Sequence, residues 1–183
     1  MTIDALPFDD VDVVGDVFEV LAAIPARSVE AIHSYHFLEH VTPLPQLLEE
    51  CARVLRPRGL MHAVVPHFSN PYFYSDYTHK QTFGLYSFSY LTDDALFRRR
   101  VPSYLVEPAF TLEDVRLEFK APPPFYVRYG LRRLLTAWVN TSRLTQEWYE
   151  AGWTGIFPCY EIDFTLRRKR APFTAGRVAA TGW

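Results

Sequence analysis

A strand, an amphipathic helix and a second strand follow one another within residues 28–65, and this order restricts the fold most. Residues 28–34 (SVEAIHS) are typical of a strand, and residues 60–65 (LMHAVV) are almost continuously apolar. A run of that kind indicates a strand covered on both faces, as in a parallel sheet. The residues between them predict one apolar helix face, since they recur at helical spacing: Leu44, Leu47, Leu48, Cys51, Ala52, Val54 and Leu55. This βαβ unit predicts an α/β fold with a doubly wound, Rossmann-like sheet.

The second half of the chain has a different pattern. Residues 66–83 are rich in aromatic side chains and histidine and predict a loop, and a helix is predicted over residues 85–97, so that residues 66–100 form an aromatic, histidine-rich loop and helix. Residues 113–119 and 160–167 alternate polar and apolar side chains, which predicts two half-buried, antiparallel strands. Residues 121–158 between them predict a helical insertion. With no internal repeat or linker, residues 1–183 are expected to form a single domain.

Composition sets limits on location and partners. A formal net charge of −2 over 183 residues gives no electrostatic reason to expect nucleic acid as a partner. No apolar run is long enough to cross a bilayer, and no signal peptide is recognised. Cys51 and Cys159 are therefore expected to be buried thiols in a reducing compartment. The predicted location is the cytoplasm.

Residues 36–40 (HFLEH) match H-x-x-E-H, a spacing that one class of zinc peptidases uses on a helix. Here the motif follows a predicted strand and is followed by Pro43 and Pro45, which leave room for about one helical turn. We therefore interpret it as a turn at the carboxyl end of a strand, where open α/β sheets bind their ligands.

Four segments in order resemble class I S-adenosylmethionine-dependent methyltransferases. They are Gly15-Asp16, residues 28–32, residues 37–41 (FLEHV) and residues 47–59 (LLEECARVLRPRG). The resemblance is to the branch that reads LEHv and RVLkPGG, with Arg58 where that pattern usually has glycine. The two alternating strands also resemble the C-terminal antiparallel hairpin of this fold.

The resemblance implies S-adenosylmethionine as the cofactor. By position, Asp4 would bond the ribose and Asp16 would contact the adenine, with Gly15, Val17 and Ser34 in the same site. The alternative for either aspartate is a strand-end cap. The Gly-rich turn after the family's first strand is missing, so the resemblance implies an N-terminally truncated fold. The sequence would then be a fragment or a late start, a partner would supply the first strand, or cofactor binding would be lost.

Polar residues after predicted strands are the candidates for acceptor chemistry. Histidine titrates near neutral pH, so His36, His67 and His79 are candidate proton acceptors, and Asp76 is placed to orient His79. The alternative is that each of these side chains bonds backbone in an ordered loop. His67, Asp76 and His79 are suitable metal-ligand types, but their spacing matches no metal motif, and no metal site is predicted.

These features predict methyl transfer from S-adenosylmethionine to a small-molecule or glycan acceptor. The alternative is a catalytically inactive methyltransferase-like scaffold or partner-binding subunit. A missing strand leaves an open sheet edge, which favours a homodimer or a partner that supplies the strand. Residues 126–139 form a basic amphipathic helix that either covers the sheet or makes peripheral membrane contact.

Overall fold

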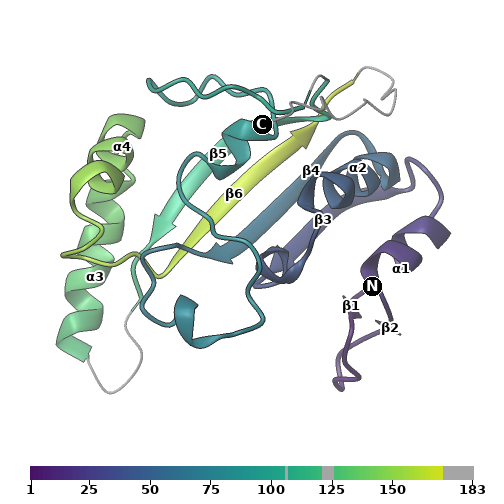
Figure 1. Cartoon of the computed structure of the whole chain (residues 1–183), viewed down its shortest axis with the longest axis horizontal. Helices are drawn as coiled ribbons and strands as arrows, with labels where there is room; N and C mark the ends of the chain where they lie inside the picture. The colour runs from purple at the N-terminus through teal and green to yellow at the C-terminus, as the bar shows by residue number, and fades with distance from the viewer. Residues whose placement is uncertain (106, 121–125, 171–183) are drawn as a thin grey trace.

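The computed structural model describes residues 1–105, 107–120 and 126–170 of this α/β protein (Figure 1). The strands are β1 Ile3–Asp4, β2 Val13–Val14, β3 Val29–Tyr35, β4 Leu55–Pro66, β5 Phe110–Glu118 and β6 Glu161–Arg168. The α-helices are α1 Val17–Ala23, α2 Leu44–Val54, α3 Tyr126–Val139 and α4 Arg143–Gly152. Short 3-10 helices span Leu38–His40, Phe73–Ser75 and Ser87–Tyr90.

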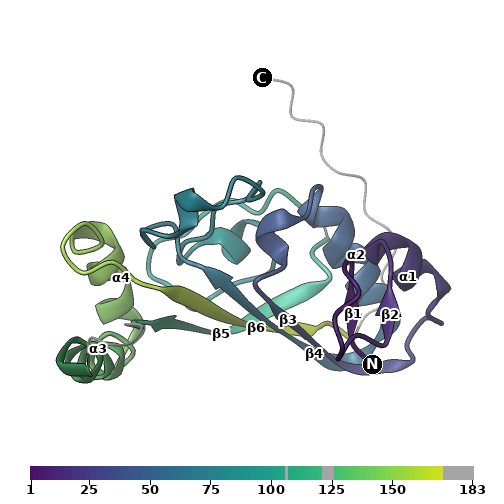
Figure 2. The ribbon, with the colours of Figure 1, turned by 90° about the horizontal axis from the view of Figure 1, so that it is seen from below.

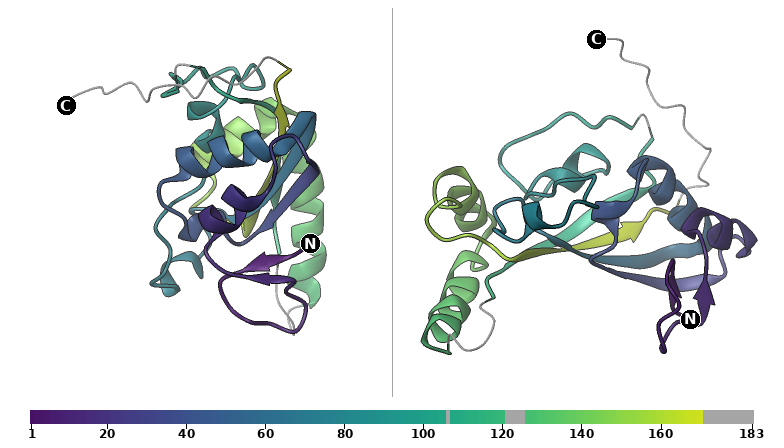
Figure 3. Two further views of the ribbon diagram at one scale, coloured as in Figure 1. Left: turned by 90° about the vertical axis from the view of Figure 1, so that its right-hand side faces the viewer. Right: turned by 60° about the horizontal axis from the view of Figure 1, so that its bottom comes forward.

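The main sheet has the strand order β3-β4-β6-β5. β3 and β4 are parallel, with Ser34 opposite Ala63, and β6 is antiparallel to both β4 and β5. This arrangement confirms the predicted α/β class with its βαβ unit and its C-terminal antiparallel pair. β1 and β2 pair in parallel as a separate two-stranded sheet, at the opposite end of the molecule from α3 and α4 (Figure 3).

The core lies between the main sheet and the elements on one side of it. α2 and the connection from β4 to β5 lie on this side (Figure 2). Met61, Ala63 and Val65 of β4 are buried there, in one cluster with the apolar face of α2. On the other face His62 is only partly buried, stacks on His33 with ring centroids 5.1 Å apart, and hydrogen-bonds Thr165. The expectation that residues 60–65 would be covered on both faces is therefore met on one face.

The predicted helix over residues 85–97 is wrong, because only Ser87–Tyr90 is helical there, as a 3-10 turn. Side chains of Thr92 and Asp94 make the local hydrogen bonds that would compete with a helix. The Thr92 hydroxyl donates to the Phe88 carbonyl at 2.8 Å, and Asp94 accepts from the Ser89 hydroxyl at 2.5 Å. Such local bonds favour turns over continued helix.

A turn near the start of β4 contains Arg58, which departs from the family's RVLkPGG pattern. Arg58 has a φ of 69°, a left-handed conformation in which glycine is the least strained residue. At the next residue, Gly59, an added Cβ would lie 2.9 Å from the Arg56 carbonyl oxygen and 3.0 Å from that of Glu30. This turn therefore needs glycine at position 59 for space and favours it at position 58 for backbone conformation.

Side chains from the α3–α4 pair close the outer edge of β5. The Asn140 amide accepts from the Leu117 N–H at 3.0 Å and donates to the Leu117 carbonyl at 2.8 Å. The Thr136 hydroxyl accepts from the Phe119 N–H, and Gln146 donates to the Val115 carbonyl. At the opposite edge β3 pairs, among the described residues, with β4 alone. Among the described residues, side chains of α3 and α4 and of the residue between them thus bond the backbone at the β5 edge of the main sheet, whereas no further strand pairs with β3 at the other edge.

Candidate functional site

The candidate site lies where β3 and β4 end and β6 begins. His36 follows β3 directly, and its N–H donates to the Val64 carbonyl of β4 at 2.9 Å. Glu161, the first residue of β6, is opposite Pro66, the last residue of β4. The antiparallel β6 therefore brings a carboxylate to the carboxyl ends of the two parallel strands.

His36 lies between two carboxylates. Its Nε2 is 3.2 Å from Glu161 Oε2, and its Nδ1 is 3.6 Å from Glu39 Oε1. Hydrogen bonding to Glu161 and then to Glu39 raises the pKa of His36 to about 9, although burial opposes the shift. At neutral pH His36 is therefore an imidazolium, which must lose a proton before it can accept one.

Glu161 completes this charged group. Its residue is 5% exposed, and burial alone would raise its pKa. Hydrogen bonds from His36 and Lys120 outweigh that effect, so the pKa of Glu161 is lowered overall. The result is a buried carboxylate that stays ionised between two cations.

The H-x-x-E-H segment is a turn, as predicted. Leu38–His40 forms a single 3-10 turn after β3. Glu39 in this turn is 1% exposed, and its Oε1 lies between the rings of His36 and His40, 3.9 Å from His40 Nε2. The two histidines are thus arranged around one buried carboxylate.

The loop after β4 brings Asp76 and His79 to the same place. His79 Nε2 is 3.6 Å from Asp76 Oδ2, and the rings of His79 and His40 have centroids 4.9 Å apart. Asp76 accepts from the Thr78 hydroxyl at 2.6 Å and from the Thr78 N–H at 2.9 Å, and these bonds lower its pKa. The structure therefore gathers three of the four predicted acceptor-site residues, His36, Asp76 and His79, around Glu39 and His40.

The fourth, His67, makes its side-chain hydrogen bonds elsewhere. It is fully buried, with Nδ1 2.8 Å from the Ser69 hydroxyl and Nε2 3.1 Å from Glu150 Oε2 on α4. Glu150 also accepts from the Leu85 N–H. His67 thus links the segment after β4 to α4 through the core.

The predicted cofactor residues lie at the ends of β1, β2 and β3. Asp4 accepts from the Leu6 N–H at 2.8 Å, and the Gly15 N–H donates to the Asp4 carbonyl at 3.0 Å. Asp16 caps α1, which begins at Val17, by accepting from the N–H groups of the next turn. Ser34 is 8% exposed, and its hydroxyl oxygen is buried with no hydrogen-bond partner among the described residues.

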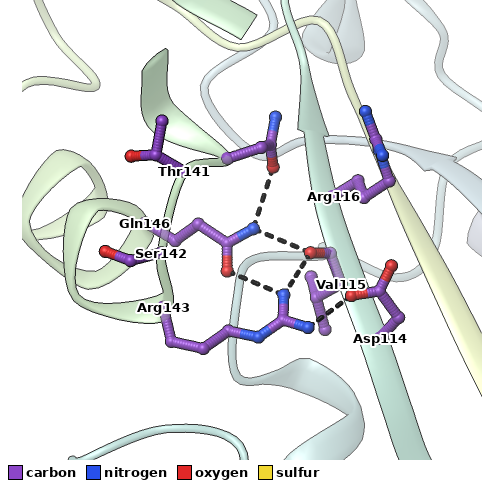
Figure 4. Close-up of a pocket in the computed structure, with 8 residues that line it drawn as sticks. Asp114, Val115, Arg116, Thr141, Ser142, Arg143 and Gln146 are labelled. Atoms are coloured by element: carbon purple, nitrogen blue, oxygen red, sulfur yellow. Dashed lines mark hydrogen bonds and ion pairs between the residues drawn. The ribbon is translucent and has the colours of Figure 1, made fainter. Parts of the chain in front are cut away.

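A pocket of about 280 Å³ lies at the edge of β5, between Asp114–Arg116 and the start of α4 (Figure 4). Arg143 donates to the Val115 carbonyl, pairs with Asp114 and contacts Gln146, which in turn bonds Asn140. The side chains of Asp114, Asn140, Arg143 and Gln146 are therefore already engaged with one another or with the Val115 carbonyl, as the dashed lines in Figure 4 show. These contacts join the start of α4 to β5.

Two residues of the site, Lys120 and Glu161, were not among the sequence candidates. Lys120 directly follows the predicted strand over residues 113–119 and Glu161 lies within that over residues 160–167, and charged residues at such positions are common and carry no signal of their own. Only the pairing of β6 with β4 brings Glu161 to His36. The sequence shows Glu161 only as a charged residue near the start of a predicted strand, and its burial is known from the structure alone.

The profile of a methyltransferase domain family matches residues 3–63. A search of curated protein sequences finds no significant match. Among the described residues, no helix combines the length and apolar character needed to cross a membrane.

Solved structures of methyltransferases resemble the fold. A SAM-dependent methyltransferase from Archaeoglobus fulgidus aligns with a TM-score of 0.50 and 17% identity over 87% of this chain and 68% of that one. A putative methyltransferase from Bacillus halodurans aligns with a TM-score of 0.49 and 15% identity over 88% of this chain and 73% of that one. A putative sarcosine dimethylglycine methyltransferase from Galdieria sulphuraria aligns with a TM-score of 0.46 and 18% identity over 89% of this chain and 61% of that one. At 17% identity and a TM-score of 0.50, the likeness to the Archaeoglobus fulgidus protein concerns the fold alone.

Proposed function

We propose that this chain, a class I methyltransferase domain by its family match over residues 3–63, uses S-adenosylmethionine to methylate a small-molecule or glycan acceptor. The observation that carries the proposal is where the matched segment lies. It contains the ends of parallel strands β1 and β2, with Asp4, Gly15 and Asp16, and the end of β3, with Ser34. Open α/β sheets bind ligands at such ends.

The residues present suit this cofactor. The carboxylates of Asp4 and Asp16 are acceptors for ribose and adenine groups, and Gly15 and Val17 lie beside them in the chain. The buried Ser34 hydroxyl is a polar group that still lacks a partner among the described residues, so a ligand hydrogen bond there would stabilise it. When bound, the cofactor would supply a methyl group on a sulfonium sulfur.

Proton removal from the acceptor is the task assigned to the histidine group. His79 Nδ1 lies 2.9 Å from the Phe73 carbonyl, which holds the Nδ1–H tautomer and leaves the Nε2 lone pair available, with Asp76 beside it. We therefore assign proton acceptance to His79 and its orientation to Asp76. His36, as a cation, would position an electron-rich acceptor, and His67 would position the loop.

Two partner surfaces follow from the same geometry. The outer edge of β3 is suited to pairing with a strand of a second copy or of a partner chain. Exposed apolar side chains of α3, Leu131, Leu134 and Trp138, recur at i, i+3 and i+7 and are 63%, 70% and 46% exposed. Such a stripe suits peripheral membrane contact.

An inactive scaffold is the second candidate function, and the β3 edge is the observation that favours it. A strand edge whose backbone groups lack partners binds another chain whether or not chemistry follows. In that case β3 would bind its partner without any requirement for S-adenosylmethionine.

Calorimetric titration of the purified chain with S-adenosylmethionine tests the proposal. Asp16→Asn is the main variant, because asparagine keeps the cap of α1 but removes the charge. Asp10→Asn, an exposed aspartate in the preceding loop, is the matched control. Micromolar binding that falls at least tenfold in Asp16→Asn alone would support the proposal. A native chain that does not bind would contradict it and favour the scaffold.

A further inference from the structure

We propose that Glu39, His40 and His79 form a binding site for a divalent first-row transition metal cation. One ligand atom from each of the three residues lies within 4.8 Å of the other two. They come from the turn after β3 and the loop after β4, so the site joins two segments far apart in sequence. This inference does not rest on the proposed methyltransferase function, but a metal ion on His79 Nε2 would occupy the lone pair that is assigned there to proton acceptance, so His79 would not act as the base while the metal is bound.

The tautomers of both histidines suit metal binding. His79 Nδ1 lies 2.9 Å from the Phe73 carbonyl, so this nitrogen carries the hydrogen. His40 Nδ1 lies 3.0 Å from the Thr78 hydroxyl, which donates its own hydrogen to Asp76 and therefore accepts from His40. In both rings Nε2 is left with its lone pair. Metal-binding histidines usually have their other nitrogen held by a carbonyl or a hydrogen-bonded side chain in this way.

Glu39 supplies an independent observation. The residue is 1% exposed, and its Oε2 has no hydrogen-bond partner in the described part of the chain. A buried carboxylate oxygen without a partner is costly, and native structures rarely keep one without a reason. A cation held between Glu39 and the two imidazoles would satisfy that oxygen.

Backbone bonds hold the two halves of the site together. The Glu39 carbonyl accepts from the N–H groups of Lys80 and Gln81 at 2.7 Å and 3.0 Å. The residues that follow His79 are thus fixed to the turn that carries Glu39 and His40. A site whose ligands are held by the surrounding backbone loses less freedom on binding.

The ligand set indicates the class of metal. Two imidazole nitrogens and one carboxylate suit Zn²⁺, Fe²⁺, Co²⁺ and Mn²⁺ better than Ca²⁺ or Mg²⁺. The His40 side chain is 34% exposed, so water can reach the site and complete the coordination. His40 Nε2 is now 3.9 Å from Glu39 Oε1. An ion about 2.1 Å from each ligand would draw these atoms roughly 0.5–1 Å closer.

Titration of the chelator-treated chain with Zn²⁺ and with Mn²⁺, followed by calorimetry, tests this inference. We expect one site per chain, with affinity at least tenfold weaker in His79→Gln and in His40→Gln. The matched control is His33→Gln, since His33 is an exposed histidine on β3 whose ring stacks on His62, outside the cluster. Thermal unfolding of each apo variant checks that the fold is kept.

Two results would overturn the inference. One is a native chain that binds neither ion more tightly than millimolar. The other is an equal loss of affinity in His33→Gln, which would indicate adventitious histidine binding. Glu39→Gln should weaken metal binding at least tenfold as well, and if this variant fails to fold, the His40→Gln and His79→Gln variants decide the question. Asp16→Asn separates this outcome from that of the proposed function. It removes a charge from the predicted cofactor site but leaves all three metal ligands in place, so its metal binding should be unchanged whatever its affinity for S-adenosylmethionine.

Discussion

The side chain of Asn140 makes the two hydrogen bonds to Leu117 that a neighbouring strand would otherwise make. Its Oδ1 accepts from the Leu117 N–H at 3.0 Å and its Nδ2 donates to the Leu117 carbonyl at 2.8 Å. Nδ2 also lies 2.8 Å from the Thr136 carbonyl. One amide therefore joins the end of α3 to the last strand of the sheet, and the closed state of that edge depends on it.

Replacing Asn140 by alanine should lower the free energy of unfolding by about 1–3 kcal/mol, because both Leu117 backbone groups lose their partner. Urea unfolding measures the change. Arg133→Ala, at an exposed position on α3, is the control and should alter the free energy by about 0.5 kcal/mol or less. Equal effects of the two substitutions would contradict the role given to the amide.

Arg58→Gly should stabilise the chain by roughly 0.5–1 kcal/mol. Arg58 has a φ of 69°, and relief of that strain exceeds the extra chain entropy that glycine brings to the unfolded state. The Arg58 carbonyl, which accepts from Arg167 at 3.1 Å, is kept. Thermal unfolding should show a higher Tm, and a lower one would refute the strain argument.

Gly59→Ala should destabilise the folded chain, in contrast to Arg58→Gly. The new Cβ would meet the carbonyl oxygens of Arg56 and Glu30, which are backbone atoms and cannot rotate away. We expect a loss of about 1–3 kcal/mol, as for other overpacked sites. Circular dichroism during urea unfolding measures the loss, and a neutral substitution would mean that the turn near the start of β4 adapts easily.

Stability should fall as pH rises from about 6.5 to 9 through the His36–Glu161 contact. The folded-state pKa of His36 is raised from 6.5 to about 9, so its contribution is complete below 6.5 and is lost above 9. The side chain is 47% exposed, and solvent screening should limit the contribution to roughly 1 kcal/mol. Unfolding of the native chain and of His36→Gln at pH 6 and pH 9.5 provides the measurement. The native chain should lose more stability between the two pH values than the variant does.

Much of the fold could be predicted because its periodicities are local. The apolar spacing of α2 and the alternation of β5 and β6 depend on residues a few positions apart. All three elements are present in the predicted segments, although β5 begins at Phe110 and not at residue 113. The helix over residues 85–97 was predicted from composition alone. In the structure Thr92 and Asp94 make local side-chain hydrogen bonds of the kind that favours turns.

The candidate site was predictable only in part. His36, Asp76 and His79 are polar residues after strands, and that position alone identifies them. The importance of Glu39 depends on two facts that no local pattern contains. These are its burial beneath two imidazoles and the attachment of residues 80–81 to its carbonyl. Glu161 likewise joins the site only through the register of β6 on β4.

The difference between the two edges of the main sheet limits how copies of this protein can assemble. A sheet with two available edges can add a copy at each side and extend into a fibre. Here side chains of α3 and α4 occupy the β5 edge, and β3 is the edge left without a strand partner among the described residues. Two copies joined at β3 would present only closed edges outward. Association through the described strands of this sheet would therefore stop at a pair and would not extend into a fibre.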